Sequence, residues 1–277
     1  MTSIASSPDA LDAFARAHPR LFVLTGAGVS TGSGIPGYRD REARWQRRQP
    51  VTHQDFVRSD AARRRYWARS MAGWPLMANA APNAAHQALA RLEQAGRIAQ
   101  LVTQNVDGLH QRAGSARVIE LHGNIHGVIC LDCRAPLRRA DLQARLDAAN
   151  PAFAGGTARV APDGDADLER DFESFAVPAC PACGGTLKPD VVFFGANVPR
   201  PLAARALAAL EDADAVLAIG STLMAYSGYR FCEHAHAAGK PVAAINLGRT
   251  RADALLELKI EEDCVTVLSA LAERLSD

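Results

Sequence analysis

The chain has 277 residues, 48% of them hydrophobic, and its 31 basic and 30 acidic side chains leave a formal net charge of +1. This balance excludes the strongly basic signature of a general nucleic-acid binder, and the apolar content excludes a disordered chain. No apolar run is long enough to cross a bilayer and the first ten residues lack a secretory signal, so we expect a cytoplasmic protein whose six cysteines are thiols or metal ligands.

Short aliphatic and β-branched runs alternate with amphipathic segments along most of the chain. This alternation is typical of a parallel sheet covered by helices, so we predict an α/β fold. The expected strands are residues 21–24, 98–103, 118–121, 191–194, 215–219, 242–246 and 265–268. The expected helices are residues 83–94, 201–211 and 227–238, the last followed by Gly239 as a left-handed terminal residue.

Two stretches interrupt this alternation. Residues 39–69 contain ten arginines and four acids, which predicts a small helical insertion with a basic surface. Residues 130–183 contain two cysteine pairs around a loop rich in Gly, Pro and Asp, a composition typical of a small module held by a metal ion.

The strongest physical signal is a pair of C-x-x-C turns separated by 46 residues. The four cysteines are Cys130, Cys133, Cys180 and Cys183. Four thiolates complete a tetrahedral zinc site and leave no position for water, so we predict one structural Zn2+. The alternative is two redox dithiols or buried thiols, which would require two separate redox motifs in one intracellular chain. Cys232 and Cys264 are left for packing or lining roles.

A glycine-rich segment, GAGVSTGSGIPG, occupies residues 26–37 directly after the first expected strand. Such glycines let backbone amides approach a pyrophosphate, as in dinucleotide-binding folds. The spacing is G-x-G-x-x-x-G, and residues 46–49 offer no acid to bind a ribose, which argues against an ordinary hydride-transfer dehydrogenase. The loop contains no lysine, which excludes a Walker-type NTPase.

Small or hydrogen-bonding residues follow four of the expected strands. They include Thr103 to Asp107, the Leu-His-Gly segment at His122, and the segments that begin at Gly220 and Asn246. Ligands bind at the carboxyl ends of parallel strands, so we expect a site there, although Asn105 and Asp107 are also ordinary turn formers.

One further motif, Asp163-x-Asp165-x-Asp167, is similar to the start of a calcium loop. It lacks the required glycine and closing glutamate, so we interpret it as a solvated loop.

Together these motifs resemble the sirtuin (Sir2) family of NAD-dependent protein deacylases, in family order and over nearly the whole chain. The matching segments are GAGVSTGSGIPGYRD (26–40), TQNVDGLH (103–110), LHG (121–123), the two C-x-x-C pairs, KPDVVFFG (188–195), GST (220–222) and NLG (246–248). The segments QRRQPVTH (46–53), RRYWAR (64–69), GWP (73–75), APDGD (161–165) and YSGYRF (226–231) resemble the class II branch that contains the animal mitochondrial lipoamidase sirtuin, and the chain is similar to a bacterial member.

The resemblance implies three structural parts. These are a Rossmann-like NAD-binding domain (1–50, 83–127 and 186–277), a helical module (51–82) and a zinc-binding module (128–185). It implies that NAD is bound by Gly26, Ala27, Gly28, Ser30, Ile35, Pro36, Tyr38, Arg39, Gln104, Asn105, Asp107, Gly220, Ser221, Thr222, Asn246, Leu247, Gly248 and Cys264.

The family chemistry implies three catalytic residues, with His122 as the general base beside Asn105 and Asp107. Nicotinamide would leave NAD, the acyl oxygen of a lysine would capture the ribose carbon, and an O-acyl-ADP-ribose and free lysine would result. The resemblance implies acyl-lysine proteins or peptides as partners, held along Val192, Phe193, Phe194 and Gly195 opposite a loop near 223–227. We expect no nucleic-acid or membrane partner.

The acyl group is less constrained by the motifs. Tyr66 and Arg69 have the Y-x-x-R spacing that binds an acidic acyl group in desuccinylating relatives, and the alternative of a structural tyrosine with a surface arginine is equally open. Ala196 stands where many relatives carry an acid, and Tyr38 stands where the commonest branch carries Phe.

Two other functions use the same motifs. One is mono-ADP-ribosyl transfer to a protein, with a different nucleophile. The other is a non-catalytic NAD or ADP-ribose sensor, against which the presence of His122, Asn105 and Asp107 argues.

Overall fold

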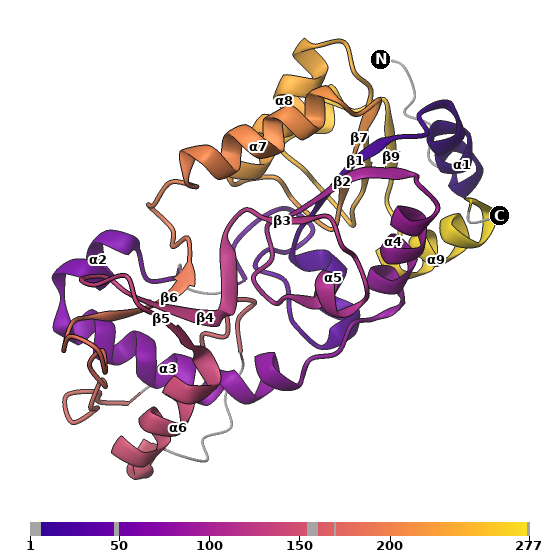
Figure 1. Ribbon diagram of the computed structural model, residues 1–277. Helices are drawn as coiled ribbons and strands as arrows, with labels where there is room; N and C mark the ends of the chain where they lie inside the picture. Colours follow the sequence, from indigo (N-terminus) through magenta and orange to yellow (C-terminus); the bar gives the residue numbers. More distant parts are fainter. Residues whose placement is uncertain (1–6, 47–49, 154–159, 169, 276–277) are drawn as a thin grey trace.

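The computed structural model describes residues 7–46, 50–153, 160–168 and 170–275 (Figure 1). The sequence segments discussed at residues 1–10 and 46–53 therefore lie partly outside the described residues.

Six parallel strands form the larger sheet, in the order β3-β2-β1-β7-β8-β9. They are β1 (Leu21–Thr25), β2 (Ile98–Thr103), β3 (Val118–Glu120), β7 (Ala215–Ile219), β8 (Val242–Ile245) and β9 (Leu258–Ile260). β1, β7 and β8 are buried over their whole length, which is why they are continuous aliphatic runs without alternation. The predicted Rossmann-like sheet is confirmed.

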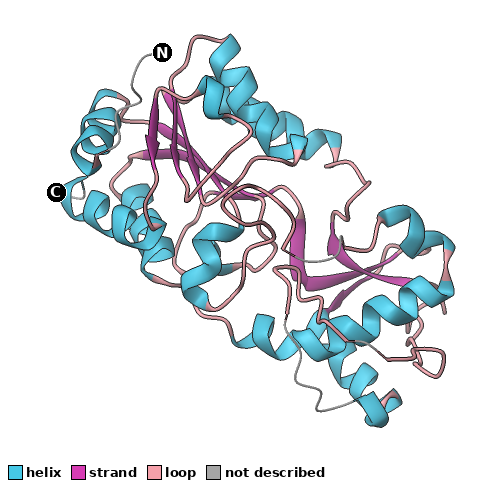
Figure 2. Cartoon of the chain, turned by 180° about the vertical axis from the view of Figure 1, so that it is seen from behind, coloured by secondary structure: helices cyan, strands magenta, loops and turns pink. Residues whose placement is uncertain are grey.

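Helices cover both faces of this sheet (Figures 1 and 2). One face carries α1 (Pro8–Ala17), α4 (Ala84–Gln94) and α9 (Cys264–Leu275), and the other carries α7 (Arg200–Glu211) and α8 (Tyr226–Ala237). Val23 of β1 packs toward the first group, whereas its neighbours Phe22 and Leu24 pack toward the second. This is the alternation of side chains that a strand requires.

The strand order places a crevice beside β1. From β1 the chain moves outward to β2 and β3, and it later returns to β7 on the other side of β1 before moving on to β8 and β9. The loops that follow β1 and β7 therefore run in opposite directions. In open parallel sheets this switch point is where ligands bind.

A second, smaller unit lies beside the sheet, at the lower left of Figure 1. Its antiparallel strands are β5 (Pro136–Arg138), β4 (Gly123–Cys130) and β6 (Leu187–Val191), in that order. They pack with α2 (His53–Arg58), α3 (Asp60–Asn79) and α6 (Arg139–Ala149) around a core that includes Phe56, Trp67 and Leu146. The predicted helical insertion and the cysteine-rich segment thus share one hydrophobic core.

The remaining short elements are η1 (Ala27–Ser33), α5 (Leu109–Arg112), η2 (Pro151–Phe153) and η3 (Asp253–Leu255). Within the described ranges, no helix combines the length and the apolar character that crossing a membrane requires.

Two predicted strands are wrong. Residues 265–268 belong to α9, whose buried positions Cys264, Val267, Leu268 and Leu271 have helical spacing. Residues 192–194 follow β6, which belongs to the small sheet. There the N–H of Val192 donates to the carbonyl of His122, and Phe194 forms an isolated bridge with Thr52. β4, β5 and β9 were not predicted.

The interpretation of residues 163–167 as a solvated loop is also wrong. Gly164, Asp165 and Ala166 are buried against α3. A Cβ atom on Gly73 of α3 would lie 2.0 Å from the carbonyl oxygen of Gly164, so this close contact requires glycine at position 73. The loop is therefore an integral part of the helical unit.

Candidate functional site

A cavity of about 880 Å3 lies at the carboxyl ends of β1, β2, β7 and β8. The predicted residues that line it are Gly26, Ala27, Gly28, Ser30, Ile35, Tyr38, Arg39, Tyr66, Gln104, Asn105, Asp107, His122, Val192, Phe193, Phe194, Gly195, Gly220, Ser221, Thr222, Asn246, Leu247 and Cys264. Pro36, Gly248 and Arg69 do not line it. One site therefore contains nearly all the residues predicted from motifs far apart in the sequence.

The glycine-rich loop after β1 packs directly on the loop after β7. The backbone N–H of Gly26 donates to the carbonyl of Ile219, and that of Gly28 donates to the carbonyl of Gly220 at 2.8 Å. A Cβ on Gly28 would lie 2.7 Å from Cα of Gly220. These two glycines therefore serve close loop packing, and their amides are already engaged, which differs from the predicted role of facing a pyrophosphate.

Cys264 contributes a thiol at the start of α9. Its Sγ lies 3.4 Å from the carbonyl oxygen of Gly28, and it lines the cavity. Burial, with a smaller effect of the nearby Asp263 charge, raises the pKa of this thiol to about 11. Cys264 is therefore a neutral lining group.

Asp107 lies in a buried hydrogen-bond network. Ser30 Oγ donates to Asp107 Oδ2 at 2.7 Å, and the N–H of Leu109 donates to Oδ1 at 3.0 Å. Asn105 Nδ2 donates to Ser30 Oγ at 3.0 Å and to the carbonyl of Gly26. The network holds the Asp107 carboxylate and the Asn105 amide in fixed orientations against the glycine-rich loop.

His122 precedes β4 and lies between two hydrogen-bonding groups. Nδ1 is 2.8 Å from the carbonyl of Gln104, and Nε2 is 2.8 Å from Ser227 Oγ. A carbonyl only accepts, so we assign the proton to Nδ1, and Nε2 accepts from the Ser227 hydroxyl. Burial lowers the pKa of His122, the Gln104 hydrogen bond raises it, and the charge of Arg230 lowers it. The imidazole is therefore neutral, with its basic nitrogen toward the cavity residue Ser227.

Two further histidines, His86 and His110, lie behind this network with ring centroids 4.8 Å apart. Thr25 Oγ1 lies 2.8 Å from Thr103 Oγ1 and 2.9 Å from His110 Nε2. Burial lowers the pKa of both histidines, that of His86 to about 4. Sequence reasoning did not single out His86, because a polar residue on the inner face of α4 has no partner that spacing reveals.

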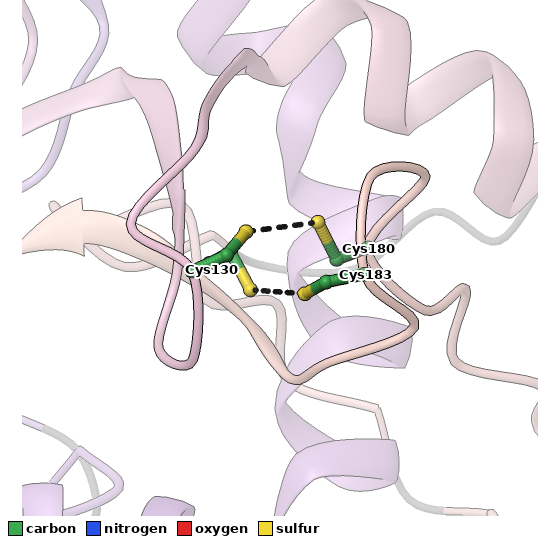
Figure 3. A group of neighbouring side chains, drawn as sticks. Cys130, Cys180 and Cys183 are labelled. Atoms are coloured by element: carbon green, nitrogen blue, oxygen red, sulfur yellow. Dashed lines mark hydrogen bonds between the residues drawn. The ribbon is translucent and has the colours of Figure 1, made fainter.

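The four predicted zinc ligands cluster in the small unit, and none of them lines the cavity. Figure 3 labels three of them, Cys130, Cys180 and Cys183. The four sulfur atoms lie within 4.8 Å of one another, with Cys130 to Cys183 at 3.6 Å and Cys133 to Cys180 at 3.8 Å. These distances are far too long for a disulfide. A tetrahedron of Zn–S bonds of about 2.3 Å has edges of about 3.8 Å, so the arrangement fits one structural Zn2+.

The segment after β6 borders the cavity near His122. The N–H of Val192 donates to the carbonyl of His122 at 2.7 Å, and the N–H of His53 donates to the carbonyl of Phe194. The ammonium of Lys188 binds the carbonyls of Pro189 and Val191 and lies 4.5 Å from the ring of Phe193. Backbone hydrogen bonds and the Lys188 ammonium therefore fix the position of this segment. The side chain of Phe194 is nevertheless exposed, with 39% of its surface accessible.

Tyr66 and Arg69 have different surroundings. Tyr66 is buried and lines the cavity, and its hydroxyl has no hydrogen-bond partner of good geometry among the described residues. Arg69 Nε binds Asp165 Oδ1 at 2.7 Å, and its Nη2 binds Asp167 Oδ1 at 3.3 Å. The predicted pair does not converge on one point of the cavity.

Several lining residues were missed by sequence reasoning. They include Thr31 in the glycine-rich loop, Arg230 on α8, and the carboxylates Asp163 and Asp165. The similarity of APDGD and YSGYRF to one family branch was the available signal for the last three. Their position in the site depends on contacts that spacing alone does not reveal.

Comparison with known proteins agrees with this geometry. A family model described as "Sir2 family" matches residues 26–227. The chain is 55% identical over 272 residues to an NAD-dependent protein deacetylase of Xanthomonas campestris pv. campestris strain 8004, covering 98% of this chain and 93% of that protein. It is 56% identical over 270 residues to an NAD-dependent protein deacetylase of Bordetella bronchiseptica, covering 97% and 98%.

Solved structures give the same result. A structure of Sir2 with a p53 peptide and NAD+ superimposes with a TM-score of 0.79 at 29% identity, covering 96% of this chain and 98% of that chain. A structure of Sir2 bound to an acetylated peptide has a TM-score of 0.78 at 28% identity, with the same coverage.

Proposed function

Because the chain belongs to the Sir2 family, we propose that it is an NAD-dependent protein-lysine deacylase, which releases nicotinamide and O-acyl-ADP-ribose. One observation carries the proposal. A neutral His122 imidazole shares a single cavity with the Ser30–Asn105–Asp107 network and the glycine-rich loop.

The cavity fits NAD in size and in the chemistry of its lining. Its volume of about 880 Å3 lies within the range of about 300 to 1,000 Å3 that is usual for cofactor pockets. NAD, when bound, supplies an ADP-ribosyl group joined to nicotinamide by a glycosidic bond. We assign the nicotinamide end to Ile35 and Asp107, the adjacent ribose to Gln104 and Asn105, and the adenosine end to the loops after β7 and β8 with Cys264.

His122 acts as the general base in this proposal. Its Nδ1–H is held by the Gln104 carbonyl, which fixes the ring and leaves Nε2 as the only basic nitrogen. With substrates bound, Nε2 exchanges the Ser227 hydroxyl for a substrate hydroxyl and takes its proton. A lowered pKa keeps the base unprotonated at neutral pH, so no prior deprotonation is needed.

We assign the acyl-lysine peptide to the groove between residues 192–195 and 223–227. Both segments line the cavity and flank His122. Phe194 offers exposed apolar surface there, and an extended peptide could use the backbone groups of both segments, as in strand addition.

The test uses acetylated peptide and NAD with the purified protein. We expect stoichiometric release of nicotinamide and deacetylated peptide, and His122→Ala should reduce both by at least about 100-fold. Nicotinamide release with labelled protein and no deacetylation would instead identify a mono-ADP-ribosyltransferase. NAD binding without any turnover would identify a sensor.

Three further parts of the proposal follow from the sequence. We propose a cytoplasmic location, a structural Zn2+ on Cys130, Cys133, Cys180 and Cys183, and a domain division near the predicted limits. β4 and β6 extend the zinc-binding module to residues 123 and 191.

A further inference from the structure

The cavity extends past the proposed peptide groove to α3 and to the loop of residues 160–168. Tyr66, Phe193, Val51 and Pro162 line this end, together with the carboxylate residues Asp163 and Asp165. If the chain is the deacylase proposed above, on which this inference rests, the acyl group of a lysine held beside His122 extends toward this end. We call it the acyl end.

Arg69 is the cation of the Y-x-x-R pair with Tyr66, and its guanidinium is already bound. Asp165 and Asp167 both contact its guanidinium, and Arg69 does not line the main cavity. Its side chain is only 18% exposed and that of Asp165 only 10%. Two carboxylates therefore already balance the charge of Arg69 through charge-assisted hydrogen bonds to Nε and Nη2, so little attraction is left for a third.

The loop itself is held firmly in this position. The carbonyl of Gly164 approaches Gly73 so closely that no side chain fits at position 73, and the N–H of Ala166 donates to the carbonyl of Arg69. Arg69 is therefore joined to the loop by backbone and side chain together.

The groups that do face the acyl end are negative or neutral. Burial raises the pKa of Tyr66, and the charge of Asp163 raises it more than the charge of Arg139 lowers it. Arg139 lies between the rings of Trp67 and Trp74 and does not line the cavity. Arg39 does line it, but its guanidinium donates to Ala43 and lies 4.0 Å from the centroid of Trp45.

Burial disfavours negative charge at this end, and it raises the pKa of Asp163. Burial and the neighbouring Asp163 raise the pKa of Asp165 to about 7, in spite of its ion pair with Arg69. The charge of a third carboxylate at the same place would be disfavoured in the same way, whereas a hydrogen-bond donor would find acceptors in Asp163 and in the Tyr66 hydroxyl.

We propose that Asp163 and Asp165 determine acyl selectivity by charge, so that the chain rejects acyl groups ending in a carboxylate and accepts neutral ones, including those ending in an amide or hydroxyl.

The experiment compares two peptides that differ only in charge. One carries succinyl-lysine and the other succinamoyl-lysine, in which an amide replaces the terminal carboxylate, and an acetyl-lysine peptide serves as reference. We expect acetyl and succinamoyl peptides to be cleaved and kcat/KM for the succinyl peptide to be at least about tenfold below that for succinamoyl. Equal or better cleavage of the succinyl peptide would overturn the inference.

The variants Asp165→Asn and Asp163→Asn/Asp165→Asn should raise the succinyl to succinamoyl ratio of kcat/KM at least about fivefold. The ratio is independent of the fraction of folded enzyme, since both peptides are assayed on one sample. Asp171→Asn is the matched control, because Asp171 is exposed and lies outside the cavity lining. An unchanged ratio in both carboxylate variants would contradict the assignment.

A binding measurement separates this inference from the proposed activity. Loss of acetyl-peptide turnover would refute the deacylase, but the affinities of the succinyl and succinamoyl peptides for the intact protein can still be compared. Weaker binding of the succinyl peptide supports charge selection, and equal or tighter binding refutes it.

Discussion

Replacement of Ser30 by alanine tests the network that orients Asp107. The Ser30 hydroxyl donates to the Asp107 carboxylate at 2.7 Å and accepts from Asn105, and both Ser30 and Asp107 are buried. A hydrogen bond to a charged group contributes about 1.5 to 3 kcal/mol, and about 1.4 kcal/mol corresponds to a factor of ten. We therefore expect Ser30→Ala to reduce kcat/KM for NAD by about 10- to 150-fold.

The assay is the initial rate of nicotinamide release at varied NAD with saturating acetyl peptide, together with the melting temperature of each variant. Ser33→Ala is the control. Ser33 lies in the same η1 segment as Ser30, its hydroxyl accepts a hydrogen bond from Asn83, and it does not line the cavity. It should stay within about twofold of the parent, as substitutions away from such networks do. A loss below threefold in Ser30→Ala would refute the reasoning.

Three other outcomes follow from the structure. Because burial lowers the pKa of His86 to about 4 and that of His110 as well, the unfolded chain binds more protons below pH 6.5, so the melting temperature should fall from pH 6.5 toward pH 4. The melting temperature of His86→Gln should fall less over the same pH range, and an identical dependence of melting temperature on pH would contradict this. Cys183→Ser should lower bound zinc, measured by metal analysis, from about one equivalent to below about half, and a parent protein below half an equivalent would count against the site. Lys188→Met leaves two buried carbonyls without their donor, so peptide KM should rise more than kcat falls, and an unchanged KM would show that Lys188 does not position Phe193.

The sequence predicted the parallel sheet well because its inner strands are buried on both faces. β1, β2, β7 and β8 match the expected ranges to within one residue, since short continuous runs such as LFVL and AVLAI are typical of strands buried on both faces. α9 was misread because the window at residues 265–268 is too short to distinguish the two periods, and its helical pattern appears only when Leu271 is included.

The site was predictable where residues directly follow a strand, because the sheet brings those positions to one edge. The ion-pair partner of Arg69 was not predictable from the sequence, since Asp165 lies 96 residues further along the chain in a motif that resembles an incomplete calcium loop. Burial of that loop depends on contact with Gly73. Charge at the acyl end is therefore a tertiary property that no local pattern contains.

The pairing of β4 with β6 links the cysteine cluster to the reacting centre over a distance. Cys130 at the end of β4 pairs with Leu187, and the other end of the same ladder places the carbonyl of His122 on the N–H of Val192. The ladder shifts register between Gly123 and Val128. If a slip of one residue at the cysteine end carried through this shift, it would turn the following side chains to the opposite face. It would also move residues 192–195 by about 3.4 Å relative to His122, at a point roughly 17 Å along β6 from the cysteine end. The metal site thus fixes the strand register of β4 and β6. Through that register it sets the alignment between the base and its substrate, although it lies close to neither.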